Sequence, residues 1–179
     1  KQFSKAIKKE CVFKINGYVV GDGTYFEQLS IPNTWQYDDI GNYYGSGVHG
    51  LNFHDNEFSL FFKQTPAMWE RPSIERVYPE MSDVHFENRV TSGPPKSGDN
   101  SNIFGEPLVK TRYVQGTFPA GNGRFTIRGS ISNPPLTCAE SLVRAFTNEK
   151  CSVSGGAIDY NTYLKTVGTP LTRHTFYTY

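Results

Sequence analysis

The sequence predicts a mainly β fold: an antiparallel β-sandwich or open barrel of about eight to ten short strands, with one short α-helix at about residues 138–147. The first observation is the count of 17 glycines and 11 prolines, which is typical of many short strands joined by turns. The second is the alternation of apolar and polar residues with a period of two in several segments. The third is the content of 13 Phe and 11 Tyr, which supplies core area despite a mean hydropathy of −0.50.

The chain has 179 residues, enough for one domain with a sizeable core and short for two. We therefore expect a single β-rich domain over residues 1–179. No segment repeats at a solenoid or propeller period.

A hairpin is predicted from residues 111–118 and 124–131, joined by residues 119–123. Asn122-Gly123 accommodates the positive φ angles of a tight connection. In the second segment Phe125, Ile127 and Ile131 alternate with polar residues, so one face of this strand is expected in the core.

The segment after Pro134-Pro135 has the only strong helical signal. Thr137 and Glu140 have the spacing of a capping box. An apolar stripe follows at helical spacing, which predicts a helix of about ten residues; it consists of Ala139, Leu142, Val143 and Phe146.

The remaining segments give shorter signals. Residues 1–10 form either a short helix or a solvated arm. Hairpin arms are expected at 11–15 with 18–20, and at 48–53 with 57–63. Further strands are expected at 74–78, 84–90, 158–167 and 171–179, and residues 91–102 read as an exposed loop.

Three cysteines, Cys11, Cys138 and Cys151, are candidates for one disulfide and one free thiol. A ten-residue helix spans about 15 Å, whereas bridged Cα atoms lie about 4.4–6.8 Å apart. A bridge between Cys138 and Cys151 therefore requires the chain to double back, and Cys11 is the competing partner. The order of Pro134-Pro135, Cys138, helix and Cys151 resembles the C-terminal part of some type IV pilin-like subunits, although the long apolar helix of those proteins has no counterpart here.

The net charge of +1 argues against a nucleic-acid partner, because no field of one sign covers the molecule. No apolar run approaches the roughly 20 residues of a membrane helix. Together with the cysteines, this favours a secreted or cell-surface protein, and we expect no cofactor and no metal.

The segment at residues 31–47 interleaves aromatic rings with carboxylates, amides and glycines. Such groups suit stacking on a sugar or anchoring of a protein partner. The alternative is that the rings cover the core. The predicted ligand-binding residues are Trp35, Tyr37, Asp38, Asp39, Asn42, Tyr43 and Tyr44.

An acid/base site is the alternative. His85 and Glu87 lie two residues apart on one strand face, where a surface ion pair is the simpler interpretation. With His174 and Arg128 they would form the equipment of a secreted hydrolase or nuclease toxin.

The leading functional hypothesis is a non-catalytic surface module, such as an adhesin or receptor-binding domain with a role in virulence. It would recognise a glycan or protein partner through the aromatic-rich segment. The sequence thus favours a protein that is not an enzyme.

Overall fold

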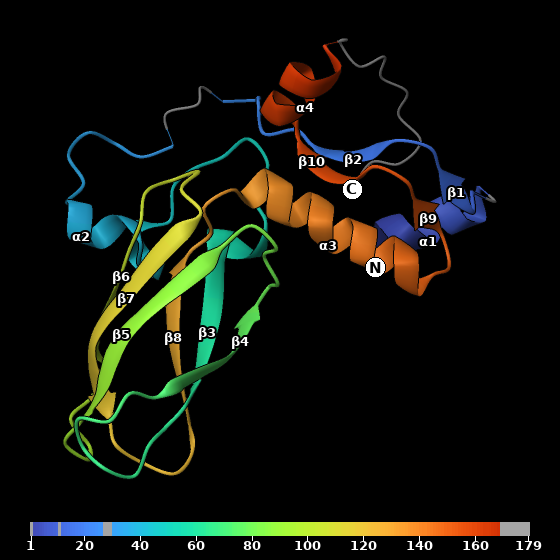
Figure 1. The fold of residues 1–179 in the computed structure, drawn as a ribbon. Helices are drawn as coiled ribbons and strands as arrows, with labels where there is room; N and C mark the ends of the chain where they lie inside the picture. The colour runs from blue at the N-terminus through green and yellow to red at the C-terminus, as the bar shows by residue number, and fades with distance from the viewer. Residues whose placement is uncertain (1, 11, 27–29, 169–179) are drawn as a thin grey trace. The chain divides into compact units, whose positions relative to one another are not determined.

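The computed structural model describes residues 2–10, 12–26 and 30–168 and confirms a mainly β class with few helices. The described strands form four small sheets, two of two strands and two of three, in place of one continuous barrel (Figure 1). The chain divides into two compact units. Unit 1 comprises residues 1–26, 49–51 and 135–179, and unit 2 comprises residues 27–48 and 52–134. A single domain over residues 1–179 stays a prediction.

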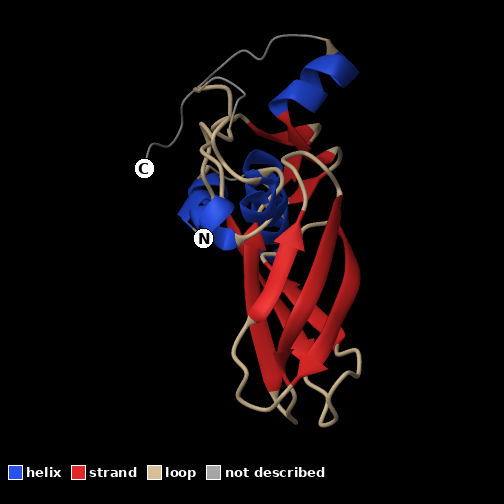
Figure 2. Cartoon of the chain, turned by 90° about the vertical axis from the view of Figure 1, so that its left-hand side faces the viewer, coloured by secondary structure: helices blue, strands red, loops and turns tan. Residues whose placement is uncertain are grey.

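Unit 2 contains the two three-stranded sheets. In the first, β3 (Glu57–Lys63) lies between β4 (Ser73–Tyr78) and β8 (Arg124–Ser130), and both pairings are antiparallel. In the second, β7 (Thr111–Pro119) pairs in parallel with β5 (His85–Gly93) and antiparallel with β6 (Asn100–Phe104). Figure 2 shows these strands in red from a second direction.

The two sheets of unit 2 share one hydrophobic core. Alternate residues of β3 point inward, and Phe58, Leu60 and Phe62 are at most 1% exposed. Across the core, the rings of Phe62 and Phe118 meet edge to face with centroids 5.2 Å apart, and Phe118 stacks on Phe125 at 4.6 Å. The buried members of this core are Phe58, Leu60, Phe62, Met81, Val90, Ile103, Val114, Phe118, Ile127 and Ile131.

The predicted hairpin of residues 111–118 and 124–131 is wrong, although both segments are strands. β7 and β8 belong to different sheets, and residues 120–123 carry the chain from one sheet to the other. The side chain of Gln64 holds this crossing by donating from Nε2 to the carbonyl of Pro119 at 2.7 Å. A short glycine-containing connection suits a crossing between packed sheets as well as a hairpin, so the local signal did not distinguish them.

Unit 1 joins the two ends of the chain through parallel strand pairs. β1 (Lys14–Ile15) pairs with β9 (Ser152–Val153), and β2 (Tyr18–Gly21) pairs with β10 (Gly156–Asp159). The predicted hairpin between residues 11–15 and 18–20 is therefore wrong, because each arm pairs with a distant strand.

The described part of unit 1 also holds helices α1 (Gln2–Lys9) and α4 (Tyr160–Val167). Helix α1 confirms the helical alternative for the N-terminal segment. Residues 160–167, predicted as a strand, form a helix. Asp159 caps it by accepting from the backbone N–H of Thr162 at 3.0 Å, and Gly168 ends it in the left-handed conformation.

Helix α3 (Pro134–Asn148) has 15 residues and begins four residues earlier than predicted. Prolines are compatible with the first turn of a helix, where their missing N–H groups have no intrahelical partner. Thr137 therefore lies inside the helix, and the predicted start at a Thr137–Glu140 capping box is wrong.

Two loop predictions change. Residues 48–53 form no strand, and the exposed loop at 91–102 shrinks because β5 extends to Gly93 and β6 begins at Asn100. None of the described helices is both long and apolar enough to cross a bilayer.

Candidate functional site

The aromatic-rich segment in unit 2 forms two short helical turns, α2 (Tyr37–Ile40) and η1 (Tyr43–Gly45). Its rings are partly exposed. The exposed fractions are 36% for Trp35, 58% for Tyr37, 38% for Tyr43 and 54% for Tyr44. Burial and the nearby carboxylates Asp39 and Asp38 raise the pKa of Tyr44, so this hydroxyl stays neutral at physiological pH.

Asn42 is the buried anchor of this segment and is 4% exposed. Its Oδ1 accepts from the backbone N–H of Ile103 at 2.9 Å, and its Nδ2 donates to the carbonyl of Asp38 at 2.7 Å. Its backbone also bridges to Gly129 of β8. The side-chain amide of Asn42 thus ties the segment to β6 and closes the turn at Asp38, and its backbone ties the segment to β8. The surface role predicted for the other six residues stays a prediction.

A strained turn lies between Phe53 and β3. His54, Asp55 and Asn56 have φ angles of 56°, 54° and 56°, three successive non-glycine residues in the left-handed region. Such conformations cost energy for L-residues and persist only where the surroundings hold them. Here the surroundings are supplied chiefly by the side chain of Asn56.

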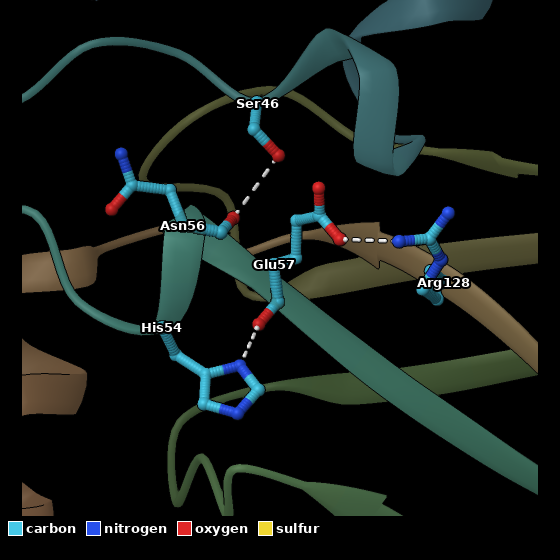
Figure 3. A network of polar contacts seen from close by, with 5 residues as sticks. All are labelled: Ser46, His54, Asn56, Glu57 and Arg128. Atoms are coloured by element: carbon cyan, nitrogen blue, oxygen red, sulfur yellow. Dashed lines mark hydrogen bonds and ion pairs between the residues drawn. The ribbon is translucent and has the colours of Figure 1, made fainter.

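Asn56 is 5% exposed and is a hub of hydrogen bonds. Its Nδ2 donates to the carbonyl of Gly47 at 2.9 Å and to Oδ1 of Asn52 at 2.7 Å, while its Oδ1 accepts from the N–H of Phe53 at 3.1 Å. Its carbonyl accepts from the hydroxyl of Ser46 at 3.1 Å (Figure 3). The turn is therefore held both by residues 46–47, before it, and by residues 52–53, at its start.

Beside this turn, charged and aromatic side chains gather at one end of the outer face of β3 and β8. Arg128 donates from Nη1 to Oε2 of Glu57 at 3.1 Å (Figure 3). Its guanidinium lies 3.8 Å from the centre of the Tyr43 ring. His54 hydrogen-bonds through Nδ1 to the carbonyl of Glu57 at 3.0 Å, and its ring meets that of Tyr78 edge to face at 5.1 Å. Sequence analysis singled out Arg128 and Tyr43 separately and missed their contact, which depends on tertiary packing.

The predicted acid/base set does not converge in the structure. His85 and Glu87 lie 3.2 Å apart on β5, both well exposed, as the surface ion pair that was the simpler interpretation. Arg128 lies on the outward side of the other sheet, so the shared core of unit 2 separates it from His85 and Glu87. His174 lies outside the described residues.

Cys138 and Cys151 are both free, so neither takes part in the one disulfide that the three cysteines were expected to form. Helix α3 has 15 residues and spans about 23 Å. Most of the helix lies between Cys138 and Cys151 in the sequence. Burial raises the pKa of the Cys138 thiol, opposite to what a nucleophile needs. Cys11 lies outside the described residues. Among those that are described, no group of side chains has the composition of a metal site.

The family model of the D-Ala-D-Ala carboxypeptidase 3 (S13) family matches residues 1–175. The chain belongs to this family. No curated protein sequence matches it. Two solved structures with the same fold are crystal structures of penicillin-binding protein 4 from Haemophilus influenzae, and the chain spans about a third of their length.

The first of these structures has a TM-score of 0.68 at 17% identity, and the match covers 89% of this chain and 36% of that chain. The second is a complex with a novel β-lactam, with a TM-score of 0.54 at 14% identity, covering 88% of this chain and 33% of that chain. At these identities the likeness concerns the fold.

Membership of the S13 family corrects the functional hypothesis. The family is one of D-Ala-D-Ala carboxypeptidases, which are enzymes. The predicted non-catalytic adhesin, the preference for a protein that is not an enzyme, and the cell-surface glycan or protein partner are therefore wrong. The extracytoplasmic side of the localisation prediction agrees with membership of this family.

Serine penicillin-binding proteins carry Ser-x-x-Lys, Ser-Asp-Asn and Lys-Thr-Gly motifs, and none of the three occurs in the 179 residues. Two Ser-x-x-Arg sequences come closest to the first, Ser73 to Arg76 on β4 and Ser141 to Arg144 on α3. The Nη2 of Arg144 donates to the hydroxyl oxygen of Ser141 at 2.9 Å. A guanidinium that stays protonated donates to this hydroxyl but does not remove its proton. This serine therefore lacks the activation that a lysine amine would provide.

Proposed function

We propose that the protein carrying this chain is a D-Ala-D-Ala carboxypeptidase, which hydrolyses the peptide bond between the last two D-alanines of a peptidoglycan stem peptide. The observation that carries the proposal is the family match over residues 1–175. The likeness of fold to penicillin-binding protein 4 over 89% of the chain supports it. Because the substrate is a wall polymer, we also propose a secreted or surface location.

The proposed reaction is acyl transfer to a serine followed by hydrolysis. Attack of the hydroxyl on the D-Ala carbonyl breaks the amide bond, a protonated amine leaves as D-alanine, and water then splits the ester to release the shortened peptide. We assign the nucleophile to no residue of this chain, because Ser141 faces a permanent cation in Arg144.

We further propose that unit 2 is a β-sandwich that serves as a scaffold in this enzyme. Its two sheets contribute inward side chains to one core, and its surface carries the polar cluster around Arg128. A scaffold of this kind positions surface groups on rigid strands, which suits contact with a polymeric substrate.

The test is release of D-alanine by the purified protein from an N-acylated peptide ending in D-Ala-D-Ala. We expect release from this peptide, none from the same peptide ending in L-Ala-L-Ala, and inhibition by a β-lactam. A protein that releases no alanine, or releases it without regard to stereochemistry, would not be a D-Ala-D-Ala carboxypeptidase.

The variant Ser141→Ala tests the assignment of the nucleophile. We expect D-alanine release to change by less than about twofold, because the hydroxyl has no base. A loss of about a thousandfold or more, with an unchanged melting temperature, would identify Ser141 as the nucleophile and overturn the assignment.

A further inference from the structure

The outer face of the sheet β4-β3-β8 carries a concentration of positive charge, here called the basic face. Four cationic side chains project from its three strands, against two carboxylates, for a net charge of +2 on a chain whose total is +1. The cations are Lys63, Arg76, Arg124 and Arg128, and the carboxylates are Glu57 and Glu75.

The register of the strands sets the spacing of these cations. Lys63 faces Arg124 across β3 and β8, Phe61 faces Arg76 across β3 and β4, and Ser59 faces Arg128. Successive outward rows on a strand are roughly 7 Å apart, so the cations form a two-dimensional array. A bulge opposite Phe61 and Phe62 leaves Glu75 beside Arg76, and both are exposed.

The guanidinium groups of the basic face are held in place by neighbours. Arg76 lies 4.5 Å from the centre of the Phe61 ring, and Arg128 lies 3.8 Å from that of Tyr43. Arg124 donates from Nε to Oε2 of Glu75 at 2.7 Å. Stacking and hydrogen bonding reduce the rotamer entropy that these side chains lose when they bind an anion. Each guanidinium keeps further N–H donors, because five are available and the hydrogen bonds of Arg124 and Arg128 described here use one each.

The outer face of the other sheet lacks this pattern. On β5 the alternating outward residues are His85, Glu87 and Arg89, so one cation meets one carboxylate. Arg89 also stacks on an aromatic ring, Tyr113, at 4.8 Å. The two faces therefore share the stacking of arginine on an aromatic ring but differ in net charge.

We propose that the basic face docks the carboxylate groups of uncrosslinked peptidoglycan stem peptides while the enzyme acts on the polymer. The inference rests on the proposed function, because that function makes peptidoglycan the substrate. The argument for this occupant is charge complementarity: stem peptides that end in D-Ala present carboxylates, and a guanidinium binds a carboxylate through paired N–H donors. Because peptides recur along the polymer, an array of cations binds several at once and gains avidity.

The test uses the double variant Arg76→Glu/Arg124→Glu in the protein that carries this chain. The probe is insoluble peptidoglycan from which phosphate polymers have been removed by acid. We expect co-sedimentation to weaken at least about tenfold and the KM for the polymer to rise at least about tenfold, because two attractive contacts become repulsive. The KM for a soluble N-acylated peptide ending in D-Ala-D-Ala should stay within about twofold, because one short ligand gains no avidity.

Two further variants control for charge and for folding. Arg89→Glu reverses an equally exposed, ring-stacked arginine on the opposite face and should leave both KM values within about twofold. Arg76→Lys/Arg124→Lys keeps the charge and should retain most of the binding, with a melting temperature close to that of the unchanged protein.

The outcomes separate the two proposals. If the unchanged protein releases no D-alanine from the soluble peptide, the proposed function fails, while co-sedimentation still tests docking. If the double glutamate variant binds the polymer as the unchanged protein does, the docking proposal is overturned. It is also overturned if binding survives amidation of the polymer's carboxylates, or if only wall material that retains its phosphate polymers is bound.

Discussion

Unit 1 and unit 2 are each stabilised internally by different interactions. Unit 2 is built mainly from one continuous segment, and ten buried apolar side chains from its two sheets and the adjoining loops form its core. In the described part of unit 1, the buried apolar side chains are Pro135, Ala139, Phe146 and Cys151, and its strand pairs have only two and four residues. The stability of unit 2 thus depends on the burial of apolar side chains from one stretch of the chain. The stability of unit 1 depends on the pairing of two segments that are distant in the sequence.

The difference has an energetic consequence. Closing a long loop costs more conformational entropy than closing a short one, and parallel pairing between residues 18 and 156 requires such a closure. We expect unit 1 to open at a lower free energy than unit 2, and amide exchange in β2 and β10 to be faster than in β3 and β7.

The largest expected effect is in the core of unit 2. Phe118→Ala removes a ring that stacks on Phe125 and meets Phe62, and it should lower the free energy of unfolding by about 3–5 kcal/mol. Chemical denaturation measures the change, and Leu108→Ala, at a side chain 68% exposed, is the control with an effect below about 0.5 kcal/mol. Equal losses of unfolding free energy in the two variants would show that burial in this core does not dominate the stability of unit 2.

The next effect is at the strained turn. Asn56→Ala leaves the N–H of Phe53 and the carbonyl of Gly47 without their side-chain partner, and should destabilise unit 2 by about 2–4 kcal/mol. Asn122→Ala, at an exposed loop residue, provides the comparison in the same thermal unfolding experiment. A loss below about 1 kcal/mol would mean that the turn holds its shape without Asn56.

A smaller effect is expected at the closest backbone approach in unit 1. A Cβ atom at Gly21 would lie 2.0 Å from the carbonyl oxygen of Pro135, so Gly21→Ala must shift the start of α3. We expect a loss of about 1–3 kcal/mol, read out as faster amide exchange in β2 and β10 with β3 unchanged. Faster exchange in β3 as well would show that the two units open together.

The smallest effect concerns the link between α1 and α3 in unit 1. Lys8 donates from Nζ to Oε2 of Glu149 at 2.8 Å, and this hydrogen bond and the charge of Lys8 lower the pKa of the carboxyl. The resulting stabilisation is present above the usual pKa of Glu149 and is lost as the pH falls through its lowered value. Lys8→Ala should raise the pKa of Glu149 in an NMR titration. An unchanged pKa would mean that the pair does not form in solution.

Patterns that depend on neighbouring residues predicted the fold well. The alternation in Phe58, Leu60 and Phe62 identified β3, and the same period in residues 84–90 identified most of β5. Strand pairing failed at residues 119–123, because a crossing between sheets and a hairpin use the same glycines. The predicted strand at residues 158–167 is wrong from residue 160 onward, because the cap at Asp159 starts a helix that overrides a weak strand preference.

The candidate site was only partly predictable. Arg128 and Tyr43 were both predicted as site residues, but 85 positions separate them in the sequence. No local pattern indicates that the Arg128 guanidinium lies over the Tyr43 ring. Asn42 was predicted to bind a ligand through its side-chain amide, whereas this amide is buried in the structure. The basic face was not predicted, because the net charge of +1 sums over the whole chain and does not reveal a local excess of cations.

The turn at residues 54–56 has a consequence for chemical synthesis. The φ and ψ angles of Asp55, 54° and 19°, mirror those of a right-handed helical residue, so they are the preferred values for an amino acid of opposite chirality. A semisynthetic protein with D-aspartate at position 55 should gain about 1–2 kcal/mol of stability, whereas inversion at a right-handed position would do the reverse.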